Sequence, residues 1–232
     1  MALIASLRMV LAPPHRAGYP FIAAGAAVTL VGLLVSHWLF WLGLAFTLFA
    51  LYFFRDPERV TPKRPGFAVA PADGHVCSIM MAPPPPELGI GSEPRFRVAI
   101  FLSVIDVHVN RIPAAGLVTK IAYHVGTFVS ANLDKASDEN ERNAVALRLA
   151  DGRDLAVVQI AGLIARRILC DLREGDAVAT GQRFGIIRFG SRTDLYLPPG
   201  VIPLVELGQT MIGGETIIAD LSPAPVLSLE QT

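Results

Sequence analysis

A long stretch without charge limits the fold of this chain more than any other feature. Residues 17–54 include no Asp, Glu, Lys or Arg, and these 38 positions far exceed the roughly 20 that cross a bilayer once as a helix. Ser36 and His37 interrupt the stretch near its middle and leave two apolar halves, Tyr19–Val35 and Trp38–Phe54. Each half would span roughly 25 Å as a helix. The pattern therefore predicts a helical hairpin in a membrane, with Ser36 and His37 at its turn.

Basic residues on both sides of this hairpin indicate its orientation. They are Arg8 and Arg16 before it, and Arg55, Arg59, Lys63 and Arg64 after it. Because cytoplasmic segments carry an excess of Lys and Arg, we expect both ends, and the rest of the chain, on the cytoplasmic side of the cell membrane. The alternatives are a buried hairpin in a soluble protein and a signal peptide, whose apolar region would have only about 7–15 residues. We thus divide the chain into a membrane anchor (1–54), a linker (55–66) and a body (67–232).

The remaining composition argues against two classes of function. The chain has 20 basic and 20 acidic residues, so no net positive charge favours binding to nucleic acid. Its two cysteines, Cys77 and Cys170, lie far apart and without the spacing of metal ligands. We therefore predict no nucleic-acid partner and no metal site, and we expect both thiols to be reduced, with a disulfide between them as the alternative.

Short strand patterns fill the body, and little of it reads as helix. The expected strands are Val76–Met81, Arg95–Ser103, Gly116–Val125, Ala144–Ala150 and Asp154–Ile160. The last two flank Asp151 and Gly152, a pair typical of a β-hairpin turn. Residues 132–143 are polar and are expected to form a loop or a short helix, whereas residues 161–172 are mostly strand-like. The predicted fold class is mainly β, or α+β when the hairpin is included.

One internal repeat supports this fold class. The pattern Leu172-x-x-Gly175-Asp176-x-Val178-x-x-Gly181-Gln182 recurs 33 positions later, from Val205 to Glu215. Such pairs of glycine turns are typical of a small two-fold β-barrel or sandwich. The repeat is similar to the hammerhead pattern of biotinyl and lipoyl carrier domains, which attach their cofactor to a lysine. No lysine follows Lys135, which argues against a carrier role.

Gly190 and Ser191 lie between the two copies of the repeat, after the apolar run Phe184–Ile187. One interpretation is a tight turn, in which glycine supplies a positive φ and serine bonds the backbone. The other is self-cleavage: the Ser191 hydroxyl attacks the Gly190 carbonyl, and elimination from the resulting ester leaves a pyruvoyl group at residue 191. A pyruvoyl carbonyl forms a Schiff base with a substrate amine and accepts electrons as a carboxylate departs. The pair by itself does not decide between the two interpretations.

Five segments taken together resemble a known family. In chain order they are FFRDPERVTP, APADGHV, FLSVIDVHVNRIPAAG, NLDKASDENERN and IIRFGSRTDLYLP. From about residue 50 to its end, the chain is similar to the short, bacterial and archaeal type of phosphatidylserine decarboxylase proenzyme. RFGS or GSRTD alone would be a weak match. Five segments in the family's order, behind a membrane anchor, are specific.

The resemblance implies a pyruvoyl-dependent lyase that removes CO₂ from phosphatidylserine in the membrane and gives phosphatidylethanolamine. It implies cleavage between Gly190 and Ser191 into a β chain (1–190) with the anchor and an α chain (191–232) that begins with the pyruvoyl group. The two chains would stay together as a heterodimer, and a homo-oligomer of heterodimers is left open. Two alternatives remain: a membrane-anchored adaptor with a hammerhead or barrel fold and no catalysis, and a pyruvoyl decarboxylase of a soluble amino acid.

Two residues are candidates to assist Ser191. His108 lies close in sequence to Asp106 and Arg111, and we predict that it donates a proton to the carbanion or acts as the base for self-cleavage. Its alternative is a structural histidine. Asp73 matches an aspartate that, in the family's long relatives, helps a histidine activate the serine; its alternative is a residue of an Asp-Gly turn. His75 and His124 are interpreted as structural.

One departure from the long relatives affects the arginines. Where those relatives carry a second histidine, this chain has Arg111, so their serine–histidine–aspartate relay does not transfer as a whole. Arg111, Arg188 and Arg192 are candidates to bind the lipid phosphate or the substrate carboxylate. Each has the alternative of a solvated surface charge.

Overall fold

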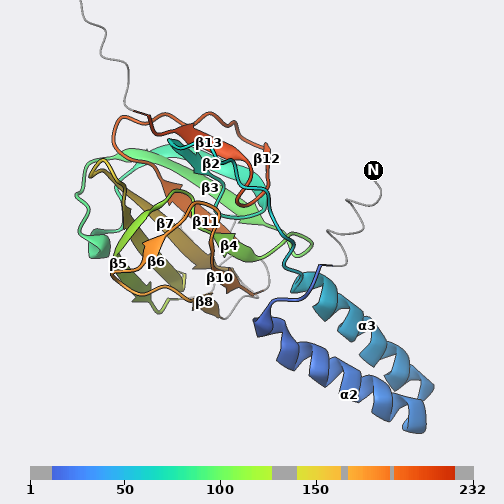
Figure 1. The fold of residues 1–232 in the computed structure, drawn as a ribbon. Helices are drawn as coiled ribbons and strands as arrows, with labels where there is room; N and C mark the ends of the chain where they lie inside the picture. The colour runs from blue at the N-terminus through green and yellow to red at the C-terminus, as the bar shows by residue number, and fades with distance from the viewer. Residues whose placement is uncertain (1–11, 127–139, 163–166, 189–190, 223–232) are drawn as a thin grey trace, which may run out of the picture.

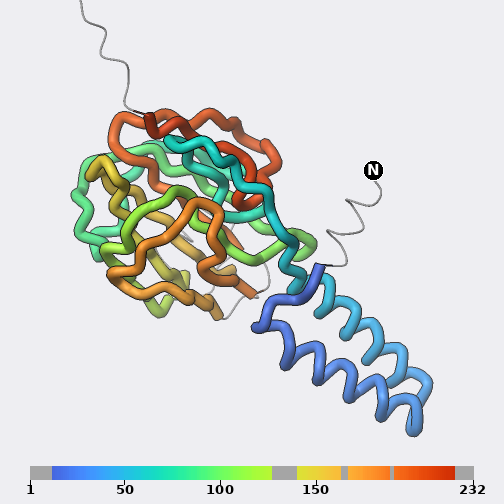
Figure 2. Tube along the Cα trace, in the orientation of Figure 1, coloured from blue at the N-terminus to red at the C-terminus, as the bar shows by residue number. Residues whose placement is uncertain are grey.

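Figure 1 shows the computed structural model of the protein, which describes residues 12–126, 140–162, 167–188 and 191–222. A helical hairpin projects from a body made almost entirely of strands. Figure 2 follows the chain from the hairpin, in blue, through the linker and into the body. The red C-terminal strands lie on the side of the body away from the hairpin. This arrangement confirms the predicted fold class.

The hairpin consists of α2 (Tyr19–Val35) and α3 (His37–Phe53), preceded by the short 3-10 helix η1 (Arg16–Gly18). Ser36 is the single residue between the two helices. The helices pack closely through glycines: a Cβ on Gly32 would collide with the backbone of Phe40, and one on Gly43 would lie 2.5 Å from the amide nitrogen of Thr29. Among the described residues, the continuous helix 16–35 is long and apolar enough to cross a membrane, whereas α3 is slightly shorter.

The base of the hairpin packs into the body. Phe53 and Phe54 are fully buried and form one apolar cluster with Val107, Val109 and Ile186. The end of α3 is therefore part of the core of the body. The expected division after residue 54 falls inside this shared cluster.

The body is organised around a curled, eight-stranded antiparallel sheet with the order β12-β2-β3-β11-β7-β6-β5-β9. In chain order its strands are β2 (Gly74–Ala82), β3 (Arg95–Leu102), β5 (Gly116–His124), β6 (Arg142–Arg148), β7 (Asp154–Ala161), β9 (Ala177–Val178), β11 (Ser191–Tyr196) and β12 (Thr210–Met211). Apolar side chains from its inner face form most of the main core. The predicted hairpin of β6 and β7 is confirmed.

Two small sheets complete the body. One has the order β4-β10-β8, from Val109–Arg111, Arg183–Ile187 and Ile168–Cys170. The other pairs β1 (Phe67–Val69) with β13 (Ile217–Asp220). In the described part of the body the only helix is η2 (Pro86–Leu88), a single 3-10 turn, in agreement with the prediction of little helix.

The predicted repeat corresponds to a two-fold arrangement of the whole body. The order β12-β2-β3-β11 on one side of the large sheet matches β9-β5-β6-β7 on the other. Equivalent glycines make equivalent backbone hydrogen bonds of 2.8 Å: Gly175 to Val118 and Gly208 to Val76, then Gly181 to Ile112 and Gly214 to Ala70. The repeat therefore reflects a real structural duplication.

The structure corrects three local expectations. Ser191, for which a tight turn was one interpretation, is the first residue of strand β11. Residues 142 and 143 belong to β6, although we expected them in a loop or short helix. Their polar side chains have partners in the folded body, Glu87 for Arg142 and Gln159 for Asn143. Within the strand-like region 161–172, the described residues place Ala161 in β7 and Ile168–Cys170 in β8; residues 127–139 and 163–166 lie outside the described part.

A matched pair of glycines tests the linker packing. Gly181 and Gly208 have nearly the same positive φ, 78° and 79°, so alanine at either site should cost about 1–2 kcal/mol in backbone strain. A Cβ on Gly181 would also collide with Thr61 of the linker, whereas no atom lies within 4 Å of one on Gly208. We expect Gly181→Ala to lower the free energy of unfolding by about 1–3 kcal/mol more than Gly208→Ala, measured by urea denaturation in detergent. Equal losses of the free energy of unfolding would show that Thr61 and the linker move aside to make room for the added methyl group.

Candidate active site

Ser191 begins the central strand of the large sheet. It pairs with Leu102 of β3 on one side and with Ala161 of β7 on the other, and it is fully buried. Its Oγ has no hydrogen-bond partner among the described residues. A buried hydroxyl without a partner is unfavourable and rare outside functional sites. Gly190, the other predicted cleavage residue, lies outside the described residues.

His108 lies directly before β4 and is also fully buried. Its Nδ1 is 3.0 Å from the carbonyl oxygen of Asp106. A carbonyl only accepts, so Nδ1 carries the proton, and Nε2 carries a lone pair. Nε2 has no partner within the described part of the chain. The imidazole packs on the ring of Phe53, with 4.2 Å between the ring centroids. Burial lowers the pKa of His108 to about 4, so the imidazole is uncharged at neutral pH.

The strand geometry brings His108 and Ser191 to the same region between the sheets. Thr193 Oγ1 accepts a hydrogen bond of 3.4 Å from Asn110 Nδ2. Because residues two apart on a strand share a face, Ser191 faces β4 as Thr193 does. His108 lies one residue before β4, and its ring packs on Phe53. Ile187, the last residue of β10, donates its amide to the His108 carbonyl, and Ser191 follows four residues later in the chain. His108 and Ser191 therefore both lie near the step from β10 to β11.

A buried chain of amide side chains supports this arrangement. Asn143 donates to Gln159 at 2.9 Å, and Gln159 donates to Asn110 at 2.8 Å. All three side chains are buried, and the chain of bonds ends on Thr193, two residues after Ser191. Satisfied polar networks in a low-dielectric interior restrict the backbone that carries them. The sequence analysis missed these residues. Gln159 could have been found as a single polar residue within the apolar run Leu155–Ala161, whereas Asn110 and Asn143 each lie beside an arginine and give no such signal.

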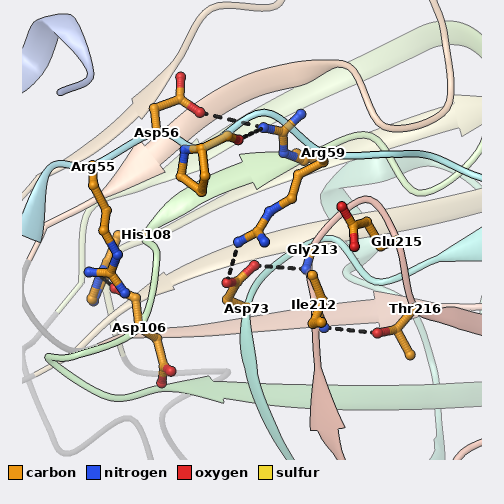
Figure 3. Close-up of polar contacts among 12 residues, drawn as sticks. Arg55, Asp56, Arg59, Asp73, Asp106, His108, Ile212, Gly213, Glu215 and Thr216 are labelled. Atoms are coloured by element: carbon orange, nitrogen blue, oxygen red, sulfur yellow. Dashed lines mark hydrogen bonds and ion pairs between the residues drawn. The ribbon is translucent and has the colours of Figure 1, made fainter. Parts of the chain in front are cut away.

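Asp73 lies at the edge of this region and binds the linker. Its Oδ2 forms an ion pair of 2.6 Å with Arg59, and its Oδ1 accepts a hydrogen bond of 2.8 Å from the amide of Gly213. Figure 3 shows the carboxylate directed to these two partners. Burial raises the pKa of Asp73, and the positive charge of Arg59 opposes that shift. Among the described residues no hydrogen bond joins Asp73 to His108, so the structure does not connect these two predicted residues directly.

Arg55 is a neighbour of His108 that the sequence analysis missed. Figure 3 shows its side chain beside His108 and Asp106. Its guanidinium donates to the carbonyls of Tyr52 (2.8 Å) and Ile105 (2.7 Å). Arg55 and Arg59 both belong to the segment FFRDPERVTP, which we interpreted only as the exit from the membrane. Two arginines directly after an apolar helix were the available signal for a linker that folds back onto the site.

The three predicted arginines have different surroundings. Arg111 is buried and donates to the carbonyls of Gly181 and Pro57, at 3.0 and 2.9 Å. Arg192 is buried and bonds Asp194 at 2.6 and 2.8 Å; as the neighbour of Ser191 on a strand, it points to the opposite face of the sheet. Arg188 is partly buried and lies 5.5 Å from the ring of Phe21 in α2. Its Nε has no partner among the described residues.

Comparison with known proteins decides the family. The family model described as phosphatidylserine decarboxylase matches residues 46–219, which is most of the chain and includes the site described above. The chain belongs to the phosphatidylserine decarboxylase family. This confirms the predicted family and enzyme class, a carboxy-lyase, and it disagrees with the alternative of a non-catalytic adaptor.

Full-length relatives agree with this assignment. A protein of Granulibacter bethesdensis named phosphatidylserine decarboxylase proenzyme is 70% identical over 96% of this chain and 91% of its own length. Proteins of the same name from Gluconacetobacter diazotrophicus and Gluconobacter oxydans are 62% and 59% identical, each over 95% of this chain and 100% of their own length. The similarity thus extends into the hairpin, beyond the region that the family model matches.

Proposed function

We propose that this chain is the proenzyme of a phosphatidylserine decarboxylase and that it cleaves its own backbone between Gly190 and Ser191. One observation carries the proposal: Ser191 Oγ and His108 Nε2 are both buried, and neither has a hydrogen-bond partner among the described residues. Neutral His108 can accept the Ser191 proton through Nε2 as Oγ attacks the Gly190 carbonyl carbon. The peptide C–N bond then breaks, the amine of residue 191 takes up the proton, and an ester remains.

The ester is expected to break by elimination. Loss of the Cα proton of residue 191 and cleavage of its Cβ–Oγ bond release residues 1–190 with a carboxylate end. Water then replaces the α-nitrogen, which leaves as ammonia, so that chain 191–232 begins with a pyruvoyl group. β11 pairs with both β3 and β7 along its six residues. These pairings support a heterodimer that remains associated after cleavage.

The proposed substrate matches the chemistry of the site. A pyruvoyl group supplies a carbonyl that reacts with a primary amine and accepts the electron pair left when CO₂ departs. We assign His108 Nε2 to take up the proton that the substrate ammonium loses as the Schiff base forms, and to return it to the α carbon after CO₂ departs, which gives phosphatidylethanolamine. Arg188, beside the hairpin and with an unpaired donor in the described part of the chain, is our candidate for the lipid phosphate.

Mass spectrometry of the purified, active protein tests this proposal. We expect two fragments, the smaller starting at residue 191 with a pyruvoyl group in place of serine. An intact chain in a fully active preparation would rule the mechanism out. Decarboxylation of phosphatidylserine in detergent micelles, compared with that of free serine, separates this function from decarboxylation of a soluble amino acid.

The hairpin supports a membrane anchor. Its surface carries large apolar side chains that the body does not cover, among them Leu30, Leu34, Val35, Trp38 and Leu42. Such a surface requires an apolar environment. With the flanking arginines, this gives our proposal that the hairpin lies in the cell membrane and the body on its cytoplasmic side.

Deletion of residues 1–49 tests the anchor. This cut keeps Phe53 and Phe54 against Val107 and Ile186 and removes Phe21 and Ile22, which cover the outer side of the same cluster. The part of the cluster inside the body therefore stays in place. We expect the shortened chain to remain in solution when vesicles are sedimented, whereas the full chain sediments with them. Self-cleavage should continue. Tight binding of the shortened chain to vesicles would show that the anchor lies elsewhere.

The pH dependence of self-cleavage tests the role of His108. A base acts in its deprotonated form, and burial lowers the pKa of His108 from 6.5 to about 4. The rate constant of self-cleavage should therefore stay level from about pH 8 down to about pH 5 and fall below that, with a midpoint near 4. Timed samples of newly synthesised proenzyme, separated by gel electrophoresis, measure it. A midpoint near 6.5 would instead indicate an exposed histidine as the base.

A further inference from the structure

The turn between β3 and β4 presents two apolar side chains to the solvent. Val104 is 38% exposed and Ile105 is 67% exposed, at the tip of a turn whose first and last residues are Ser103 and Asp106. Turns usually carry Gly, Asn, Asp or Pro, because these residues adopt or stabilise the backbone conformations of a turn. Two β-branched residues at this tip are thus unfavourable in a wholly aqueous environment.

This turn is rigid. The amide of Asp106 donates to the Ser103 carbonyl at 3.0 Å, which closes the turn. The Asp106 carboxylate accepts two further hydrogen bonds from Ser103, at 2.8 Å from its amide and at 2.6 Å from its hydroxyl. The exposure of Val104 and Ile105 is therefore built into the turn.

The turn is also fixed to the end of the hairpin. The Ile105 carbonyl accepts hydrogen bonds from the Tyr52 hydroxyl at 3.2 Å and from Arg55 at 2.7 Å. Tyr52 lies in the last turn of α3, and its ring stacks under the Arg55 guanidinium at 3.9 Å. Figures 1 and 2 show this loop, in green, next to the end of α3 that meets the body. Tyr and Arg side chains with an apolar stem and a polar tip favour the boundary between lipid and water.

We propose that the turn 103–106 inserts Val104 and Ile105 into the surface of the lipid bilayer, beside the point where α3 leaves it. The inference rests on the proposed membrane anchor, and it adds a second contact that lies next to the site. Asp106, the last residue of the turn, holds Nδ1 of His108 through its carbonyl. Insertion of the tip would thus bring the region around His108 to the level of the lipid head groups, where phosphatidylserine presents its amine and carboxylate.

A fluorescent label tests insertion directly. Ile202 is a matched control, because it is also 67% exposed but lies next to Pro203, which pairs with Ala219 of β13 on the side of the body away from the hairpin. Ile105→Cys and Ile202→Cys are labelled with an environment-sensitive dye in the full chain, with Cys77 and Cys170 replaced by serine. In phosphatidylcholine–phosphatidylserine vesicles we expect the dye at 105 to brighten severalfold and to be quenched by quenchers on the lipid chains, whereas the dye at 202 stays aqueous.

Two outcomes separate the failure of this inference from that of the anchor. If the protein sediments with vesicles but the dye at 105 behaves like the one at 202, the turn does not insert and this inference is wrong. If the protein does not sediment with vesicles at all, the anchor is wrong and this inference falls with it. The gel assay for self-cleavage reports the proposed catalytic function separately in both cases.

Activity gives a second test. Ile105→Asp should lower kcat/KM for phosphatidylserine in vesicles by about tenfold more than for a short-chain, monomeric phosphatidylserine, because burial of one isoleucine contributes about this factor. Ile202→Asp should change the two values equally. Equal losses with both substrates in Ile105→Asp would overturn the proposal and leave the turn with a purely structural role.

Discussion

Ser191→Ala is expected to leave the chain in one piece and without decarboxylase activity. Alanine cannot form the ester, so the backbone stays intact and no carbonyl group arises at residue 191. Removal of a nucleophile on which the whole mechanism depends lowers activity by at least about 10³-fold. A gel of the purified variant should show a single band at the full mass of 24.9 kDa. Cleavage into fragments of wild-type size, or substantial activity, would contradict the mechanism.

The same substitution should not destabilise the fold. Ser191 Oγ is buried and makes no hydrogen bond with the described residues, so its loss removes a desolvated polar atom and breaks no contact. We expect the free energy of unfolding to stay equal or to rise by up to about 1 kcal/mol relative to uncleaved wild type. Ser78→Ala, on the half-buried strand β2, serves as a control that should cleave normally. A marked loss of stability in Ser191→Ala would mean that its hydroxyl has a structural partner.

Features with a regular pattern could be predicted from the sequence. The hairpin was evident because a bilayer-length apolar run needs no tertiary context, and its helices end within one or two residues of the predicted halves. The repeat was evident because both copies need glycine where φ is positive, as at Gly175 and Gly208. Ser191 and His108 could be singled out because their side chains suit definite chemical roles, Ser191 as the nucleophile of self-cleavage and His108 as its base or as a proton donor.

Other features depend on contacts between distant segments. Strands β1 and β4 have only three residues each, too few to show an alternating pattern. The linker looked like a polar spacer, but Arg59 reaches Asp73, and Asp56 pairs with Arg183 at 2.7 Å, 127 residues away. Arg192 was a candidate to bind the lipid phosphate or the substrate carboxylate, but the neighbouring strands bury it in the sheet, where it pairs with Asp194. Such pairings follow from the topology, which sequence patterns do not specify.

His108→Phe is expected to separate catalysis from packing. Phenylalanine keeps an aromatic ring against Phe53, which lies 4.2 Å from the imidazole, but it removes both nitrogens. Without a base to accept the Ser191 proton, the rate constant of self-cleavage should fall by about 10²–10⁴-fold. Timed samples of newly synthesised protein on a gel measure this rate, and urea denaturation shows whether the fold is intact.

The control for His108→Phe is His75→Phe. His75 is exposed on β2 and touches Phe101 at 5.4 Å between ring centroids, so its replacement should leave cleavage unchanged. A folded His108→Phe variant that cleaves at the wild-type rate would return His108 to a structural role. The base would then have to be sought among other neighbours of Ser191. The fall in rate below about pH 5 expected above should disappear in this variant, since whatever residual cleavage remains would no longer depend on a group that titrates near pH 4.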